Sequence, residues 1–276
     1  MIKFNKFYNQ FNILSFILIV TSILFLVFKG LNFGIDFKGG TLIELRSTDK
    51  KITVSSLRNN LQAMDLGDVS VKKFGNDQDF LIKFENKNND KNIIEKIKVN
   101  IDKSFGNNFD FRRVENVGPK VSAELLKSGI IAICISLALM LIYIWIRFEW
   151  QFSLGAIIAL FHDVIITLGL FSFLNLEINL SIIAALLTIV GYSMNDTVVI
   201  FDRVRENLKK FSDIKIYELT NISINETLSR TLITSITTLL ALLSIFFFGG
   251  EVLKGFSLAM IFGVIFGTYS SMLIQF

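Results

Sequence analysis

The chain has 276 residues, of which 52% are hydrophobic, and its formal net charge is +4. Its mean hydropathy of +0.56 is above that of ordinary soluble domains, which excludes a purely soluble globular protein. A single cysteine excludes an intrachain disulfide, and a single histidine leaves almost no room for a histidine-rich metal site.

Six apolar runs are long enough, at about 17–25 residues, to cross the hydrocarbon core of a bilayer. The first run follows two lysines and exceeds the apolar region of a signal peptide, so we interpret it as a retained membrane helix. The fold class predicted is therefore an α-helical polytopic membrane protein with six transmembrane helices. The predicted spans are 11–28, 128–146, 152–174, 180–201, 231–248 and 255–274.

The segment between the first two spans is long enough to fold as a domain. Its hydrophobic alternation predicts four strands and two helices in the order β-α-β-β-α-β, which is the ferredoxin-like, split βαβ pattern. Thr53 is the expected N-cap of the first helix, and 75–78 is the expected hairpin turn. The predicted elements are strands 41–46, 68–74, 79–85 and 109–117, and helices 53–64 and 89–104.

Three parts follow from this pattern. Residues 1–28 form the N-terminus and first membrane helix, 29–127 form an extracytoplasmic α+β domain, and 128–276 form the other five membrane helices. Within the last part, 202–230 is a long charged connection. It carries six basic residues, whereas the opposite short loops carry only Lys254, so the positive-inside rule places it, and both termini, in the cytoplasm.

The connection 202–230 is expected to be an amphipathic helical hairpin on the membrane surface. Val204, Leu208 and Phe211 would face the lipid, and the basic residues would meet anionic lipid headgroups. The alternative is a plain linker.

Asp196 lies inside the fourth apolar run, where a carboxylate costs about 2.5–3.5 kcal/mol on insertion scales. Arg230 opens the fifth span at a compatible depth. We hypothesise that the two form an ion pair or alternate as partners in a proton path, because an Asp that gains and loses a proton beside an Arg changes charge. A static salt bridge between two helices is the alternative. Asn195, Thr197 and Thr234 are the expected supporting polar residues.

Asp163 in the third span lies about 18 Å from the inner end of its helix, near mid-membrane, and is the third relay candidate. Its neighbour His162 is either a supporting relay group or a histidine held in the packing by hydrogen bonds. Asp202 lies at the mouth of the fourth helix and is expected to form a surface ion pair with Arg205 or Arg203.

Small residues recur every fourth position on the sixth span, at Gly255, Ala259, Gly263 and Gly267. Such a stripe lets a neighbouring helix backbone approach closely. Similar stripes on the fourth span (184, 188, 191, 195) and the fifth (234, 237, 241) are more typical of packing than of a transport path. A polar contact between these two spans would hydrate Asp196 and Arg230.

Four motifs resemble the SecD/SecF family of protein-export proteins, and three of them match its SecF branch closely. The first, Gly34-Ile-Asp-Phe-Lys-Gly-Gly40, follows the first span, and Val117-Gly-Pro-Lys-Val-Ser-Ala-Glu-Leu125 precedes the second. The others are Phe161-His-Asp163 and the stretch from Tyr192 to Glu206. The resemblance covers essentially the whole chain. In that family Asp196 and Arg230 are assigned to the proton route.

The resemblance implies a half-transporter of the resistance-nodulation-division superfamily in the bacterial inner membrane, with a periplasmic domain. It would assist SecA-driven protein export with the proton gradient. The implied partners are a SecD subunit, the SecYEG channel, the preprotein and membrane lipids, with no nucleic acid. Protons would be the coupling ion, with no cofactor and no enzymatic activity. The alternatives are a proton-coupled small-molecule exporter and a non-conducting scaffold subunit.

Overall fold

A computed structural model describes residues 2–49, 51–64, 66, 69–84, 92–106, 108–148, 150–211 and 214–274. The chain splits into two compact units. Met1–Asn32 and Ile130–Phe276 form what we call the helix bundle, and Phe33–Gly129 forms the α/β domain.

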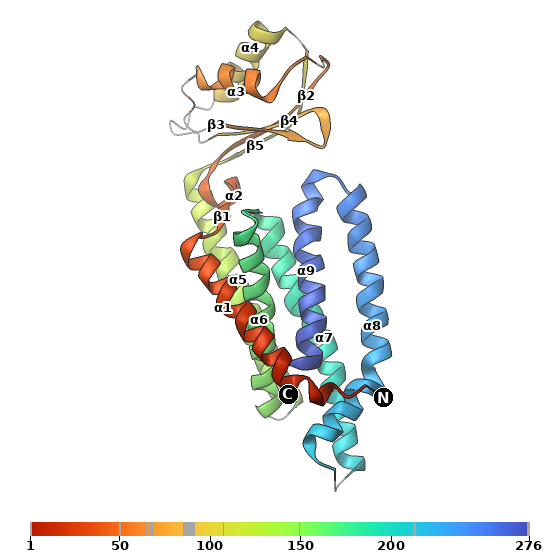
Figure 1. Ribbon diagram of the computed structural model, residues 1–276. Coiled ribbons are helices and arrows are strands. Elements are labelled where there is room, and N and C mark those ends of the chain that lie inside the picture. The colour runs from red at the N-terminus through yellow and green to blue at the C-terminus, as the bar shows by residue number, and fades with distance from the viewer. Residues whose placement is uncertain are drawn as a thin grey trace. The chain divides into compact units, whose positions relative to one another are not determined.

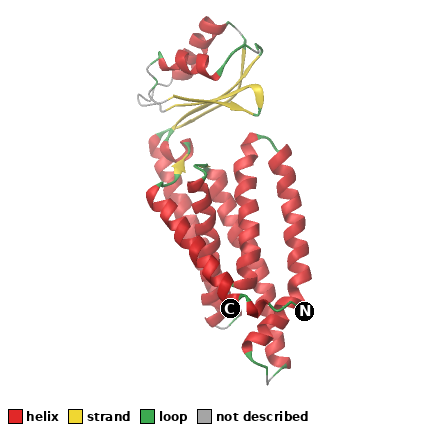
Figure 2. Cartoon of the chain, viewed as in Figure 1, coloured by secondary structure: helices red, strands yellow, loops and turns green. Residues whose placement is uncertain are grey.

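Each of the six predicted spans is a helix in the structure (Figures 1 and 2). All six helices are long and apolar enough to cross a membrane. Three of them extend well beyond the predicted spans, because α5 already begins at Pro119 and both α7 and α8 continue into the charged segment 202–230. The helices are α1 (Tyr8–Phe28), α5 (Pro119–Arg147), α6 (Trp150–Phe173), α7 (Leu180–Lys210), α8 (Ile216–Phe248) and α9 (Glu251–Leu273).

The helices of the bundle differ in how deeply they are buried. In the most apolar window of α9, 67% of the residues are buried, against 11% in α1. Helices α6 and α7 resemble α9, whereas α5 and α8 resemble α1 and present large apolar side chains such as Trp145 and Phe247 to the outside. Helices α6, α7 and α9 therefore form the interior of the bundle.

The connection between α7 and α8 is a helical hairpin, as predicted, but one of its lipid-facing assignments is wrong. Leu208 and Phe211 are exposed, whereas Val204 is buried against Leu219 of α8 and Tyr8 of α1. Because α7 continues to Lys210, Val204 lies on the same face as the buried part of the span and packs onto the facing helix. The short helix η1 (Phe4–Lys6) lies next to this hairpin.

The N-terminal segment is fastened to α8 by hydrogen bonds from two main-chain amides to two asparagines. The Ile2 amide donates to Asn225 Oδ1 and the Phe4 amide to Asn221 Oδ1, each at 2.8 Å. Asn225 and Asn221 are one helical turn apart, so both side chains lie on the face of α8 that contacts the N-terminal segment.

The α/β domain has the predicted element order β-α-β-β-α-β. Its strands pair antiparallel in the order β3-β4-β2-β5, and helices α3 and α4 cover one face of the sheet (Figure 2). Ile43 and Phe80 of the sheet pack against Leu57 and Ile97 of the helices. The elements are β2 (Gly40–Ser47), α3 (Val54–Gln62), β3 (Val69–Phe74), β4 (Asn76–Phe84), α4 (Ile93–Phe105) and β5 (Phe109–Val117).

Thr53 caps α3 as predicted, in a capping box with Ser56. The predicted hairpin turn at 75–78 is wrong in length, because only Gly75 lies between β3 and β4. Gly75 has φ +77°, which lets the chain reverse sharply and leaves 76–78 free to join β4. The predicted start of the second helix, at residue 89, lies outside the described residues.

Gly39 precedes β2 and Gly40 is its first residue, at a point where the backbone leaves little room for side chains. Their φ angles are +81° and +135°. A Cβ on Gly40 would lie 2.7 Å from the Phe84 carbonyl oxygen, and one on Gly39 would lie 3.3 Å from Pro119 Cα. The pair therefore lets β2 enter the sheet beside β4. The remaining elements are β1 (Asn32–Phe33), α2 (Ile35–Lys38) and β6 (Glu177–Ile178).

Candidate functional site

Asp196 lies on α7, in the interior of the bundle. Its residue is 4% exposed, and its Oδ2 atom is buried without a hydrogen-bond partner in the described part of the chain. Asn179 caps the start of α7, and the apolar run that follows keeps the helix continuous past Asp196. A buried carboxylate oxygen without a donor is costly, so it is a candidate functional group.

Arg230 lies on α8 and is exposed in this chain. Among the described residues no ion pair joins it to Asp196, although its charge is near enough to act on that carboxylate. Thr234 donates to the Arg230 carbonyl oxygen. Thr231, the next residue on α8, is buried, and its hydroxyl has no hydrogen-bond partner among the described residues. The structure thus brings Asp196 and Arg230 onto neighbouring helices without fastening them together.

Asp163 is in a different situation, because both of its oxygens are engaged. Its residue is 0% exposed. Oδ1 lies 2.9 Å from His162 Nδ1, and Oδ2 accepts from Ser193 Oγ at 2.7 Å and from Ser270 Oγ at 2.8 Å. These groups come from α6, α7 and α9, so the carboxylate is the centre of a polar cluster inside the bundle. We call His162, Asp163, Ser193 and Ser270 the aspartate cluster.

The histidine of the aspartate cluster is almost fully buried, and its Nε2 atom has no hydrogen-bond partner in the described residues. Its ring lies 6.1 Å from that of Tyr269. The Tyr269 hydroxyl lies 2.8 Å from Ser15 Oγ and from the Phe11 carbonyl oxygen, which joins α9 to α1.

The two supporting residues predicted next to Asp196 differ in their exposure to solvent. Thr197 is buried and donates to the Ser193 carbonyl oxygen, whereas Asn195 is exposed. The small-residue stripes on α7 and α8 do not meet each other as expected. The two helices instead touch through buried residues, with the Tyr192 hydroxyl donating to Ser235 Oγ at 3.5 Å. The exposed stripe residues are 184, 188, 191 and 195 on α7, and 237 and 241 on α8.

The predicted surface ion pair of Asp202 with Arg205 or Arg203 is wrong. Asp202 pairs with Arg147 at the end of α5, at 3.0 Å. Arg205 Nη1 lies 3.5 Å from the Arg147 carbonyl oxygen, at a helix end where carbonyls lack intrahelical partners. Arg203 pairs with Glu206 and Glu226. Asp202 therefore pairs with a residue of another helix and not with an arginine of its own helix.

The small-residue stripe of α9 lies against α7. A Cβ on Gly263 would lie 2.2 Å from Ile189 Cγ1, and one on Gly255 would lie 3.4 Å from Ile182 Cδ1. Ala259 is completely buried. At Gly267 the same contact reaches the aspartate cluster, since a Cβ would lie 3.3 Å from Ser193 Cβ and 3.6 Å from Asp163 Oδ2.

Sequence reasoning missed Ser193 and Ser270. Ser193 lies one turn before Asp196 in the most specific motif, which was the available signal. Ser270 adjoins the small-residue stripe but lies off its four-residue period, so only the packing of α9 on α6 shows that it contacts Asp163.

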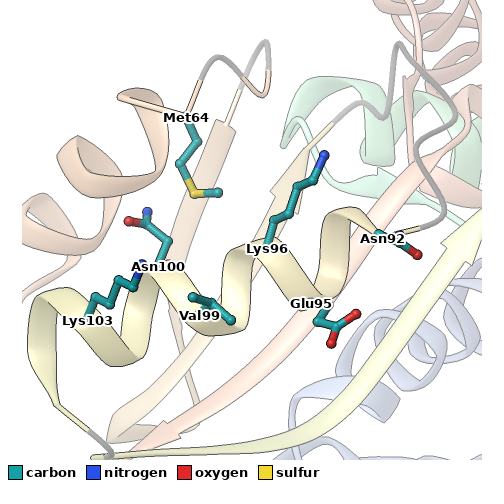
Figure 3. Close-up of a pocket in the computed structure, with 7 residues that line it drawn as sticks. All are labelled: Met64, Asn92, Glu95, Lys96, Val99, Asn100 and Lys103. Carbon is teal, nitrogen blue, oxygen red and sulfur yellow. The ribbon is translucent and has the colours of Figure 1, made fainter.

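The α/β domain has a shallow groove of about 490 Å³ along α4 (Figure 3). Met64 contributes an apolar side chain from beyond α3, and Val99 contributes another from α4. Lysines and amides complete a mixed lining without a nucleophile beside a base. The lining residues are Met64, Asn92, Glu95, Lys96, Val99, Asn100 and Lys103.

Two family models match the sequence. Residues 97–276 match "Protein export membrane protein SecD/SecF, C-terminal", and residues 24–50, which include Gly39 and Gly40, match "SecD/SecF GG Motif". The chain is 48% identical over 264 residues to a protein translocase subunit SecF of Rickettsia bellii, covering 95% of this chain and 86% of that protein. It is 44% identical to the one of Cereibacter sphaeroides, covering 93% and 82%.

Solved structures give the same result. The chain matches the crystal structure of SecDF, a translocon-associated membrane protein from Thermus thermophilus, with a TM-score of 0.88 and 36% identity. That match covers 99% of this chain and 37% of the SecDF chain. SecDF in a super-membrane-facing form matches with a TM-score of 0.73 and 35% identity. On the family models, the curated relatives and the fold, this chain belongs to the SecD/SecF family of protein export membrane proteins.

Proposed function

We propose that this chain is the SecF-type subunit of a Sec translocase accessory complex and that it uses the proton gradient to assist protein export. The names of its relatives support the accessory role in translocation. The observation that carries the proton-coupled part is Asp196, a buried carboxylate with an unpartnered oxygen in a membrane helix, near the charge of Arg230.

The coupling would come from a change of charge. An ionised Asp196 is attracted to Arg230, whose guanidinium stays protonated, and a protonated Asp196 is not. Because no ion pair fastens the two side chains in the described structure, Arg230 would be able to approach or leave Asp196 as the proton binds and departs. One charge crossing 100 mV supplies about 2.3 kcal/mol, enough to bias a two-state motion appreciably.

The exposed stripes of α7 and α8 support a membrane partner. Thr188 and Thr237 satisfy their hydroxyls by bonding carbonyls of their own helices, so these surfaces are small, smooth and weakly polar. Such surfaces suit close helix contacts better than lipid. We propose that the SecD subunit packs on these faces and shields Arg230 and Asn195 from the hydrocarbon.

The proposed setting is the bacterial inner membrane, with both termini in the cytoplasm and the α/β domain in the periplasm. There the domain would contact preprotein leaving the SecYEG channel. The basic end of the α7–α8 hairpin, with Lys209 and Lys210, would lie near anionic lipid headgroups. Protons are the proposed coupling ion.

Export into inner-membrane vesicles, with and without a proton gradient, tests the proposal. We expect Asp196→Asn to remove the gradient-dependent part of export, and Asp202→Asn, a matched change on the exposed end of the same helix, to keep it. Equal gradient-dependent export by Asp196→Asn and wild type would instead favour a scaffold subunit. An efflux assay with small molecules addresses the exporter alternative, for which we expect no gradient-dependent efflux.

A further inference from the structure

Among the described residues of the bundle, Asp163 and Asp196 are the buried carboxylates, and their hydrogen-bonding capacity is satisfied to very different degrees. Asp163 has donors on both oxygens, whereas Asp196 Oδ2 has no hydrogen-bond partner among the described residues. A carboxylate that binds and releases a proton during a cycle needs interaction partners that change, as Asp196 could have. A carboxylate held by three contacts, such as Asp163, is suited to keeping its position.

The contacts of Asp163 join the three interior helices. His162 lies on α6 with Asp163 itself, Ser193 on α7 and Ser270 on α9. The close approach of α9 at Gly263 and Gly267 adds a packed contact beside the hydrogen bonds. Rotation of α7 about its axis would therefore break a hydrogen bond to a buried carboxylate, which is costly.

Ser193 connects the aspartate cluster to the proposed relay. It lies three residues before Asp196 on α7, and its carbonyl oxygen accepts from Thr197 Oγ1 at 3.0 Å. Residues three or four apart share a helix face. The hydrogen bond from Ser193 to Asp163 therefore sets the direction in which Asp196 points one turn further on.

The contact between His162 and Asp163 is compatible with a fixed role. A proton on His162 Nδ1 would be donated to Asp163 Oδ1, and the buried Nε2 would then be an acceptor, so no N–H group of the ring would lack an acceptor. The ionisable group that contacts Asp163 is His162 of α6, whose ring in turn lies near that of Tyr269 of α9. The charged group acting on Asp196 is Arg230 of α8.

We propose that Asp163 is a positioning residue. The aspartate cluster locks the rotation of α7 against α6 and α9 and thereby holds Asp196 in the orientation from which it meets Arg230. In this role Asp163 keeps its hydrogen bonds throughout and does not carry the transported proton, which removes it from the relay expected from the sequence. The functional part of the proposal rests on the proposed role of Asp196.

Three variants of the full chain in complex with its partner subunit separate a positioning role from a carrying role. Asp163→Asn changes the carboxylate itself. The double variant Ser193→Ala/Ser270→Ala removes two donors and leaves both carboxylates intact, and Asp196→Asn removes the relay group. The measurement is gradient-dependent export as a function of pH. Because a displacement of about 1 Å at a reacting group can cost on the order of 100-fold, we expect both cluster variants to lower the rate by about tenfold.

We also expect both cluster variants to move the midpoint of the pH profile in the same direction, because Asp196 then meets a changed environment. Complete loss of gradient dependence in Asp163→Asn, with a wild-type profile in the double variant, would make Asp163 a proton carrier and overturn the proposal. A second result would also overturn the proposal, namely a lower export rate in both cluster variants with an unchanged midpoint of the pH profile. A third is failure of both cluster variants to accumulate in the membrane. Either result would mean that the cluster has only a structural role.

A labelling experiment is independent of transport. Cys134 is the only cysteine in the sequence, so Cys134→Ser provides a background for Asp196→Cys and, as the exposed neighbour, Asn195→Cys. We expect a small thiol reagent to label position 196 slowly and position 195 quickly. Adding Ser193→Ala/Ser270→Ala should raise labelling at 196 by several-fold. Unchanged labelling at position 196 would contradict the positioning role of Asp163, even if the export assay shows that Asp196 carries protons. Raised labelling would support the positioning role, even if the export assay shows that Asp196 does not carry protons.

Discussion

Ser193 donates a 2.7 Å hydrogen bond to Asp163 Oδ2 and so joins α7 to α6 one helical turn before Asp196. This contact separates the roles of two carboxylates that the sequence presents as equivalents. Asp163 is held from three helices, whereas Asp196 has an unpartnered oxygen among the described residues and an exposed charged neighbour in Arg230. With Asp163 held in place, the contact between Asp196 and Arg230 can change while α6, α7 and α9 stay together.

The contact between α7 and α9 should depend on the absence of a side chain at Gly263. A Cβ there would lie 2.2 Å from Ile189 Cγ1, so Gly263→Ala should destabilise the bundle by about 1–3 kcal/mol, the usual cost of overpacking. Thermal unfolding of the purified complex measures this loss.

The matched control is Gly255→Ala on the same helix, where a Cβ would lie at an ordinary contact distance of 3.4 Å from Ile182 Cδ1. It should leave the melting temperature nearly unchanged. Combining Gly263→Ala with Ile189→Ala should recover part of the loss, because the two positions are in contact. Additive losses in the double variant would mean that α7 and α9 do not pack as described.

In the α/β domain, stability should depend on pH through Asp79. Hydrogen bonds from Arg46, at 2.6 and 2.7 Å, hold the pKa of the Asp79 carboxyl below its ordinary value of 3.8. A carboxyl with a lowered folded-state pKa stabilises the fold above the unfolded pKa, and that stability is lost as the pH falls through the folded pKa. The sheet should therefore weaken below about pH 3.8.

Arg46→Met should lower the stability of β2 and β4 modestly at neutral pH and flatten its acid dependence, since the ion pair is only partly shielded from solvent. Hydrogen exchange of the β2 and β4 amides, corrected for the intrinsic effect of pH on exchange, measures both the loss of stability and the change in its acid dependence. An acid dependence equal to that of wild type in Arg46→Met would show that Asp79 is not responsible.

The ion pair between Asp202 and Arg147 should contribute little. Its side chains are 42% and 43% exposed, and exposed pairs are typically worth less than about 1 kcal/mol. Arg147→Ala should therefore change the melting temperature slightly and leave gradient-dependent export intact. A large loss of export on removing Arg147 would place the pair in the coupling mechanism and contradict this assignment.

Arg230→Met should lower gradient-dependent export by at least roughly tenfold, equivalent to about 1.4 kcal/mol, because it removes the charge that Asp196 meets. The variant should accumulate normally in the membrane, since Arg230 is exposed in this chain. Arg230→Lys, which keeps the charge, should retain part of the activity. Wild-type export by Arg230→Met, or its failure to accumulate, would favour a static fastening role.

The parts of the fold that follow from local pattern could be predicted from the sequence. The six spans and the β-α-β-β-α-β order rest on hydrophobic periodicity, and the Thr53 cap rests on short-range hydrogen bonding. The helical hairpin over 202–230 was predicted, but not that its two arms continue α7 and α8 without a break, because the charged residues after Asp202 suggest that the membrane helix has ended. The early start of α5, at Pro119, was missed. The length of the turn at Gly75 was overestimated because Asn76 and Asp77 are typical turn residues.

The site was only partly accessible to sequence reasoning. Asp196 stood out because a carboxylate in an apolar run is rare, and Asp163 stood out for the same reason. Which donors reach them depends on tertiary packing, and therefore Ser193 and Ser270 were missed and Arg147, rather than Arg205, meets Asp202. The sequence also gave no means to tell a fully hydrogen-bonded carboxylate from one with an unpartnered oxygen.

Proton movement through the reconstituted complex tests the central claim most directly. The chain and its partner subunit would be placed in liposomes with an internal pH-sensitive dye, and a proton gradient would be applied. Wild-type complexes should carry protons faster than empty liposomes, and Asp196→Asn should reduce this flux to the background while Asp202→Asn keeps it. Equal flux in Asp196→Asn and wild type would contradict a proton route through Asp196.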